Sequence, residues 1–167
     1  MKFEKKMLSV FLVGIAALIM AVSVDAANPK RNAKEKFQYD LEYVKTSGDG
    51  VATVKVWSCA PTWKKAQALC RRDAVHGVIF KGYSGQGAYQ APLVRSASAY
   101  EDNADFFDAF FDNGDYERYI SNVVDGSQEA RQIKGGFKVA QVVNVNVKML
   151  RKHLEEAGIA KGLSSGF

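Results

Sequence analysis

The chain contains two cysteines and two histidines, the residue types that most often form a reactive thiol or a metal site. A Cys-His hydrolase needs a thiolate held by an imidazole and a third group that orients the ring. His76 follows Cys70 on a different face of one predicted helix, and His153 lies in the apolar stripe of another. Neither cysteine, Cys59 or Cys70, has a local catalytic motif, and zinc-ligand spacing is absent. We therefore predict no catalytic residue, no metal ligand and no cofactor.

The two cysteines could instead form a disulfide. An even pair in an exported protein is the usual reason to propose one. If a helix runs unbroken from Pro61, however, Cys70 lies on the order of 15 Å from Cys59. A disulfide requires Cα atoms within about 7 Å of each other. We favour two unbridged thiols, with the disulfide as the alternative.

The carboxylates show neither a catalytic pair nor a calcium loop. Asp73 falls at the edge of a small-residue helix face, where an acid is normally hydrogen-bonded to the backbone or to an arginine. An acidic run further along the chain has the spacing of one helix face, not that of alternating loop ligands. We expect it to be a solvated face backed by phenylalanines. The run comprises Glu101, Asp102, Asp105, Asp108, Asp112 and Asp115.

The segment from Gly82 to Pro92 is rich in Gly, Ser, Gln and Tyr, which predicts a mobile loop. Its glycines follow a helix rather than a strand, and no Gly-Lys-Ser/Thr occurs, so a phosphate site is not expected. Aromatic rings on such a loop are common recognition elements. Tyr83, Gln86 and Tyr89 are therefore candidates for contact with a peptide or glycan.

Composition and the N-terminal pattern define the organisation of the chain. Of its 167 residues 47% are hydrophobic, which excludes disorder, and the formal net charge is +5. Residues 1–26 combine a basic start, an apolar run and small residues before Ala26, as a secretory signal peptide does. A polar leader over 27–36, a single domain over 37–157 and a flexible tail over 158–167 follow. The basic residues are dispersed, so nucleic acid is not an expected partner.

Hydrophobic periodicity predicts the elements of the domain. Period-two alternation over 37–44 and β-rich sequence over 51–58 flank a Gly-rich turn, which predicts a hairpin. A helix follows from Pro61, which suits its first turn, and two of its faces are apolar, so it should lie between the sheet and a second layer. A phenylalanine-rich helix over 100–112, which contains Phe106 and Phe110, would supply that layer and end at Gly114.

The last part of the chain returns to strands. Strands are expected over 117–125 and 137–147, with a turn or bulge at Gly135-Gly136 and a closing helix that ends at Gly158. Polar residues at every second place in 137–147 leave one sheet face toward water or a partner. The order β-β-α-α-β-β-α predicts an α+β fold, mainly an antiparallel sheet with helices packed on one face.

Two stretches carry a resemblance to a known group of proteins. They are Ala66-x-Ala68-x-Cys70-x-x-Asp73-Ala74-Val75, and Val143-Asn144-Val145-Asn146-Val147 with Leu150 and Leu154 after it. With the signal peptide and hairpin, they resemble small exported bacterial envelope domains such as the N-terminal domain of the flagellar T-ring protein and related small lipoproteins. The resemblance implies a non-enzymatic role in assembly or protein contact, and it transfers no functional residue. This chain differs in lacking a lipobox and in its long insertion over 82–100.

These observations lead to one expected function and one alternative. We expect an exported, periplasmic or outer-membrane-associated protein whose partner is an envelope protein or another copy of itself, without an integral membrane span after signal cleavage. Its docking surface would be the polar sheet face, the 82–92 loop or an exposed part of the phenylalanine-rich helix. The alternative is a small ligand-binding protein or hydrolase with a site beneath the loop, which a pocket joining Asp73 and His76 to the loop would favour.

Overall fold

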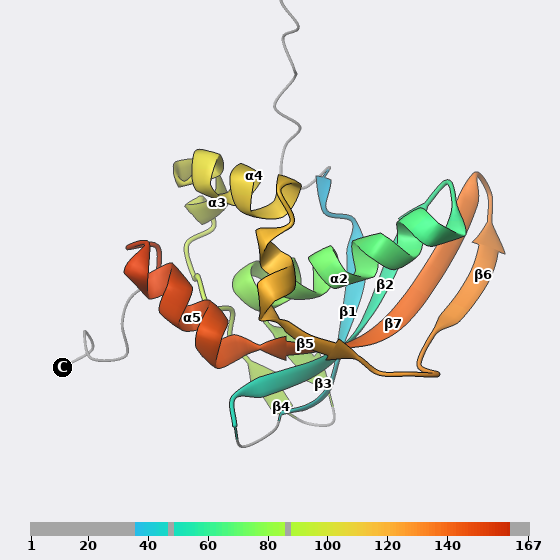
Figure 1. The fold of residues 1–167 in the computed structure, drawn as a ribbon, viewed down its shortest axis with the longest axis horizontal. Coiled ribbons are helices and arrows are strands. Elements are labelled where there is room, and N and C mark those ends of the chain that lie inside the picture. Colours follow the sequence, from blue (N-terminus) through green and yellow to red (C-terminus); the bar gives the residue numbers. More distant parts are fainter. Residues whose placement is uncertain (1–35, 47–48, 86–87, 161–167) are drawn as a thin grey trace, which may run out of the picture. The chain divides into compact units, whose positions relative to one another are not determined.

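The computed structural model describes residues 36–46, 49–85 and 88–160, which form an α+β fold (Figure 1). Within these residues the chain makes four α-helices and an antiparallel sheet of five strands. The predicted fold class is thereby confirmed. The predicted signal peptide, the leader up to residue 35 and the tail from residue 161 lie outside the described residues, as does Gln86.

The sheet is built around its longest strand, β7. Its order is β1-β2-β7-β5, and β6 also pairs with β7. β5 and β6 therefore occupy two successive stretches of the same edge, β5 against residues 143–145 and β6 against residues 136–140. The strands are β1 (Tyr39–Thr46), β2 (Val51–Ala60), β5 (Ile120–Val123), β6 (Glu129–Ile133) and β7 (Gly136–Asn146).

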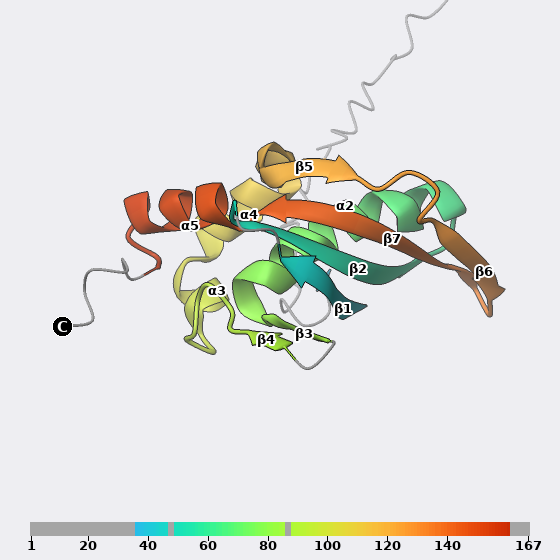
Figure 2. The same ribbon diagram turned by 90° about the horizontal axis from the view of Figure 1, so that it is seen from below.

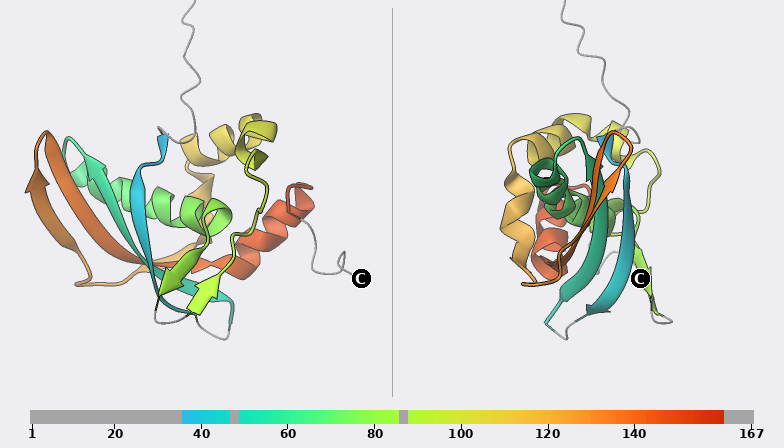
Figure 3. Two further views of the ribbon diagram at one scale, coloured as in Figure 1. Left: turned by 180° about the vertical axis from the view of Figure 1, so that it is seen from behind. Right: turned by 90° about the vertical axis from the view of Figure 1, so that its right-hand side faces the viewer.

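The two central strands have an apolar and a polar face, which the alternation over 137–147 predicted for β7. Val54 and Val56 of β2 and Val143 and Val145 of β7 are fully buried on the side of the helices. The intervening residues, such as Lys55, face the opposite side. Figure 3 shows the sheet edge-on, with the described helices on one side of it. The opposite side is called the open sheet face below.

Helix α2 (Trp63–Phe80) lies along the inner face of the sheet (Figure 2). Its N-cap is Thr62, whose side chain accepts a hydrogen bond from the backbone N–H of Lys65. Pro61 therefore precedes the cap instead of occupying the first turn, which corrects the expected start. Gly77 permits the predicted close approach, because a Cβ there would lie 2.7 Å from Leu41 Cδ2 on β1.

An aromatic layer covers the outer side of α2, as the second apolar strip of this helix predicted. Helices α3 (Ala99–Asp102) and α4 (Ala104–Asp112) and the 3-10 helix η1 (Asp115–Tyr119) form it. The single helix expected over 100–112 is interrupted at Asn103, whose side-chain amide donates to the carbonyl of Ala99. A side chain that bonds to backbone competes with helix continuation there.

The segment expected to be a mobile loop contains two short paired strands. β3 (Tyr83–Gly85) and β4 (Ala88–Gln90) are antiparallel. The chain after β4 is fixed to the end of α2, because the N–H groups of Leu93 and Val94 donate to the carbonyls of Val78 and Ile79. The prediction of a loop without regular structure is therefore wrong for these strands.

The strand expected over 117–125 is divided between two elements. Residues 115–119 form η1, and only Ile120–Val123 form β5. β6 was not predicted, because its sequence Glu-Ala-Arg-Gln-Ile lacks apolar alternation and its strand conformation comes from pairing with β7. The turn predicted at Gly135-Gly136 is present, with Gly135 at φ 85°.

Helix α5 (Val147–Glu156) closes the described fold as predicted. Asn146 caps it by accepting from the N–H of Met149, and Gly158 follows its end at φ 72°. Leu150 and Leu154 are fully buried. Among the helices of the described residues, none combines the length and the apolar character that a membrane crossing requires.

Candidate functional site

The open sheet face carries an ordered group of polar and aromatic side chains. Strand register places them, because residues paired across antiparallel strands project to the same side. No helix of the described residues covers this face (Figure 3). Its main side chains are Asp40, Glu42 and Lys45 of β1, Thr53, Lys55, Trp57 and Cys59 of β2, Glu129 and Arg131 of β6, and Lys138 and Asn144 of β7.

Trp57 is the centre of this face. In the described part of the chain, its ring is approached by Lys55 Nζ at 5.0 Å, by the guanidinium carbon of Arg131 at 5.2 Å and by Lys138 Nζ at 5.6 Å, measured to the ring centroid. Cations at this distance are attracted by the ring quadrupole, by about 0.5–1 kcal/mol each at exposed sites. The three cations come from three strands, so the sheet itself assembles the group.

Ion pairs hold two of these cations in place. Lys55 Nζ lies 2.6 Å from Glu129 Oε1, and Lys138 Nζ lies 2.7 Å from Asp40 Oδ2. Exposed pairs of this kind contribute little to stability, but here each lysine also lies over the tryptophan ring. The side chains around Trp57 are therefore ordered before any partner binds, which lowers the entropic cost of binding.

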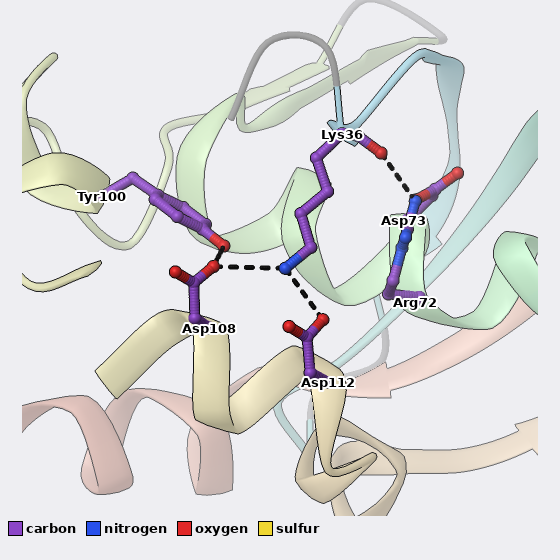
Figure 4. Close-up of polar contacts among 6 residues, drawn as sticks. All are labelled: Lys36, Arg72, Asp73, Tyr100, Asp108 and Asp112. Atoms are coloured by element: carbon purple, nitrogen blue, oxygen red, sulfur yellow. Dashed lines mark hydrogen bonds and ion pairs between the residues drawn. The ribbon is translucent and has the colours of Figure 1, made fainter. Parts of the chain in front are cut away.

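A second polar group, buried beneath the sheet, surrounds Asp73. Its carboxylate accepts from Ser58 Oγ at 2.7 Å and from Arg72 Nε and Nη2 at 3.0 and 2.8 Å. Arg72 Nη2 also donates to the carbonyl of Lys36 (Figure 4). The carboxylate is 1% exposed, and burial raises its pKa against the opposing effect of Arg72. The expected hydrogen bonding of Asp73 to an arginine is confirmed.

His76 and Tyr39 form a neighbouring buried pair. Tyr39 Oη lies 2.6 Å from His76 Nδ1, and the imidazole stacks on Phe37 at 3.8 Å between ring centroids. Burial lowers the pKa of His76 to about 3 and raises the pKa of Tyr39 well above its usual value. The two groups are thus neutral at physiological pH. Cys70 is also a poor nucleophile, because burial raises the pKa of its thiol to about 11.

A shallow groove of about 320 Å³ lies beside the β3–β4 hairpin. Tyr83 and Tyr89 of the hairpin line it, together with Tyr39 and Lys81. Lys81 Nζ lies 3.7 Å from the centroid of the Tyr39 ring, and burial lowers the pKa of this lysine. Neither Asp73 nor His76 lines the groove. The arrangement that would have favoured a hydrolase, with both residues open to a pocket at the hairpin, is therefore not found in this groove.

The residues proposed for contact at the hairpin have different environments. Tyr89 is 64% exposed, whereas Tyr83 is 6% exposed and stacks against Tyr43 at 5.6 Å between centroids. Gln86 lies outside the described residues. The prediction that Tyr83 contacts a peptide or glycan is corrected, because β1 already covers its ring.

The phenylalanine-rich helix uses most of its rings for packing within the domain. Phe110 is 3% exposed and packs against Phe111 and His153. Phe106 is half-buried and packs against Phe107 and Phe110. Phe110 is therefore corrected as a contact residue, because its ring is buried against α4, η1 and α5, whereas a contact through the half-buried Phe106 stays a prediction.

The acidic side chains of α4 contact the start of the domain. Lys36 Nζ lies 3.1 Å from Asp108 Oδ1 and 2.8 Å from Asp112 Oδ1, and the hydroxyl of Tyr100 donates to Asp108 (Figure 4). Part of the acidic run is therefore paired with a lysine, although the Asp108 and Asp112 side chains remain 49% and 63% exposed. Among the described residues, no group of three or more His, Cys, Asp or Glu is arranged to hold a metal ion.

The cysteines lie on opposite sides of the sheet. Cys59 is exposed on the open sheet face, while Cys70 is buried beneath it, where its thiol contacts the carbonyls of Val56 and Val139 at 3.7 and 3.3 Å. Both are free, as we favoured. The thiols are separated by β2 itself.

The sequence pattern did not predict the Trp57 group, which consists of Trp57, Lys55, Arg131 and Lys138. Alternation over 51–58 places Trp57 on the same side as Lys55, and this was the available signal. The partners on β6 and β7 depend on strand register, which the sequence pattern did not supply.

Comparisons of the chain with protein-family models, with curated proteins and with solved structures find no match.

Proposed function

We propose that this chain is an exported, non-enzymatic protein of the cell envelope that acts as a protein-interaction or assembly module. The open sheet face is its docking surface. The observation that carries the proposal is the half-buried Trp57 ring at the centre of an uncovered sheet face, surrounded by Lys55, Arg131 and Lys138. Tryptophan and arginine are the residues that most often dominate binding at protein interfaces.

The chemistry of the buried groups supports the same proposal. The His76–Tyr39 pair and Cys70 have pKa values that keep them neutral and unreactive near pH 7. Asp73 already accepts bonds from Ser58 and Arg72. Each of these groups has a packing or hydrogen-bonding role in the domain.

Crosslinking in intact cells, followed by mass spectrometry, tests the proposal. Trp57→Ala should remove most crosslinks to partners, because the central anchor of the face is lost. Trp63→Ala is the matched control, since Trp63 is a second tryptophan with an accessible ring, 37% exposed, but belongs to α2, away from the open sheet face. Equal crosslinking by both variants and by the unchanged protein would count against the proposed surface.

The groove at the hairpin supports a second candidate, a small ligand-binding protein. The exposed ring of Tyr89 and the ammonium group of Lys81 line the groove and would suit a small polar molecule with a flat apolar face. Tyr89→Ala with Lys81→Gln should then abolish ligand-dependent stabilisation in a thermal screen. Under the interaction proposal, the same double variant keeps its crosslinking partners.

A further inference from the structure

Two charged side chains near Trp57 on the open sheet face, Glu42 and Arg131, make no salt bridge within the described residues. Glu42 of β1 and Arg131 of β6 are exposed and make no salt bridge within the described residues, whereas Lys55 and Lys138 are paired with Glu129 and Asp40. Lys45 is also unpaired, but it lies further from Trp57, at the level of Thr53. The two charges without an ion-pair partner nearest the centre are therefore opposite in sign and on opposite outer strands.

Strand register places these charges evenly about a point between Trp57 and its partner Ala140 on β7. Glu42 pairs with Lys55, two residues before Trp57. Arg131 pairs with Lys138, which pairs with Cys59, two residues after Trp57. Across the sheet, β2 and β7 separate the two outer strands. The centre of the face, midway between the two charges, therefore lies beside Trp57.

This layout is self-complementary. A twofold rotation about an axis in the plane of the face, passing beside Trp57, exchanges the positions of Glu42 and Arg131. A twofold interface repeats each contact, so two copies would form two Glu42–Arg131 pairs and bring their Trp57 rings together at the axis. A strongly acidic or basic partner would satisfy only one of the two charges.

We propose that the open sheet face binds a second copy of this chain, with Glu42 of each copy paired to Arg131 of the other and Trp57 at the twofold axis. This inference rests on the proposed docking function of the face and names its partner. Sheets pack face to face at about 10 Å, with their strands either nearly aligned or nearly perpendicular. The axis that exchanges Glu42 and Arg131 is perpendicular to the line joining them, and that line runs diagonally across the strands. The nearly perpendicular arrangement is therefore the one that pairs these charges.

The size of the face predicts a weak dimer. Four strand positions about 4.8 Å apart, with a rise of about 3.3 Å per residue over the ten residues of β2, give about 600 Å² per copy. About 1,200 Å² in total is the lower end for specific interfaces, which favours micromolar affinity. Because charge pairs contribute to it, the association should weaken as salt rises.

Charge reversal followed by sedimentation equilibrium tests the pairing. The full chain, expressed and purified as the cell processes it, should dimerise at tens of micromolar. Glu42→Arg and Arg131→Glu should each raise the dissociation constant at least tenfold, and the double reversal should restore it to within about threefold. Glu101→Arg is the matched control, because Glu101 is an exposed acid on α3 and its reversal should change nothing.

The outcomes separate this inference from the proposed function. Both reversed residues are exposed, so circular dichroism should show each variant folded. A protein that stays monomeric at several hundred micromolar, or a double reversal that fails to recover association, would overturn the dimer. If Trp57→Ala still removed crosslinks to another protein in cells, the docking function would stand with a different partner. If Trp57→Ala changed no crosslink either, both would fail.

Discussion

At the scale of single residues, burial decides which side chains can react. His76 is 7% exposed, hydrogen-bonded to Tyr39 and stacked on Phe37. A proton on its imidazole would place a charge in a desolvated site, which is why the pKa of His76 is lowered. The same burial that lowers the pKa of His76 makes the stability of the domain depend on pH.

His76→Phe tests this dependence. The pKa of His76 is about 3 in the folded chain and 6.5 in an unfolded one, so protons bind the unfolded state more tightly. The contribution of His76 is therefore complete above about pH 6.5 and is lost as pH falls toward 3, at about 1.4 kcal/mol per pH unit. Between pH 7.5 and pH 5 the free energy of unfolding should fall by about 2 kcal/mol more in the unchanged protein than in His76→Phe.

Urea unfolding at the two pH values measures this difference. Asp73 acts in the opposite direction, because its pKa is raised and protonation favours the folded state. Its effect, and those of the nearby Arg72 and Lys81, are common to both proteins and cancel in the comparison. Parallel pH profiles for the two proteins would contradict the buried neutral imidazole.

The cysteines give a second prediction at this scale. A thiol reagent at pH 7.5 should label Cys59 in the native protein, because it is exposed. Cys70 should be labelled only after unfolding, since it is buried and its thiol has a pKa of about 11. Thiol counting by mass spectrometry without a reductant checks both statements. A denatured, unreduced monomer without free thiols would show that the cysteines are bridged.

At the scale of elements, the aromatic layer secures α2 from the side opposite the sheet. Phe107 of α4 is fully buried and packs against Phe80 of α2 at 4.8 Å and Tyr100 of α3 at 5.3 Å between centroids. Lys36 adds a polar link, because its ammonium group contacts α4 while its carbonyl accepts from Arg72 of α2. Helix α4 is thus held by both packing and charge.

Phe107→Ala measures the contribution of this layer. Loss of a fully buried phenylalanine should reduce the free energy of unfolding by about 3–5 kcal/mol, from lost burial and the cavity that remains. Asp105→Ala on the same helix is the control, because Asp105 is exposed and should change stability by less than about 0.5 kcal/mol. Equal effects of the two substitutions in thermal or urea unfolding would mean that α4 is not part of the core.

At the scale of the whole molecule, hydrophobic periodicity predicted those helices and strands whose apolar face packs against a single neighbouring layer. The alternation of β1 and β7 and the β-rich sequence of β2 predicted the sheet, and the apolar faces of α2 predicted the helix packed on it. The break at Asn103 and the strand β6 were not predictable in this way, because a local side-chain bond and pairing with β7 determine them. Pairing between strands far apart in the sequence also determines which residues surround Trp57 in the candidate site.

The Trp57 group shows the same limit. The residues around its ring belong to strands far apart in the chain, with Lys55 on β2 and Lys138 on β7, and the register of β2, β6 and β7 brings them together. Composition identifies none of them, since exposed lysines and arginines are common. Ser58 and Asp73 are likewise joined only when α2 lies across the sheet.

Site-specific photocrosslinking in intact cells tests the central claim most directly. A photoreactive residue at Ile133, which is exposed on the open sheet face, should capture a protein partner or a second copy of the chain. The same residue at Tyr89, exposed at the hairpin groove, should capture far less. Efficient capture from position 89 together with none from position 133 would contradict the account.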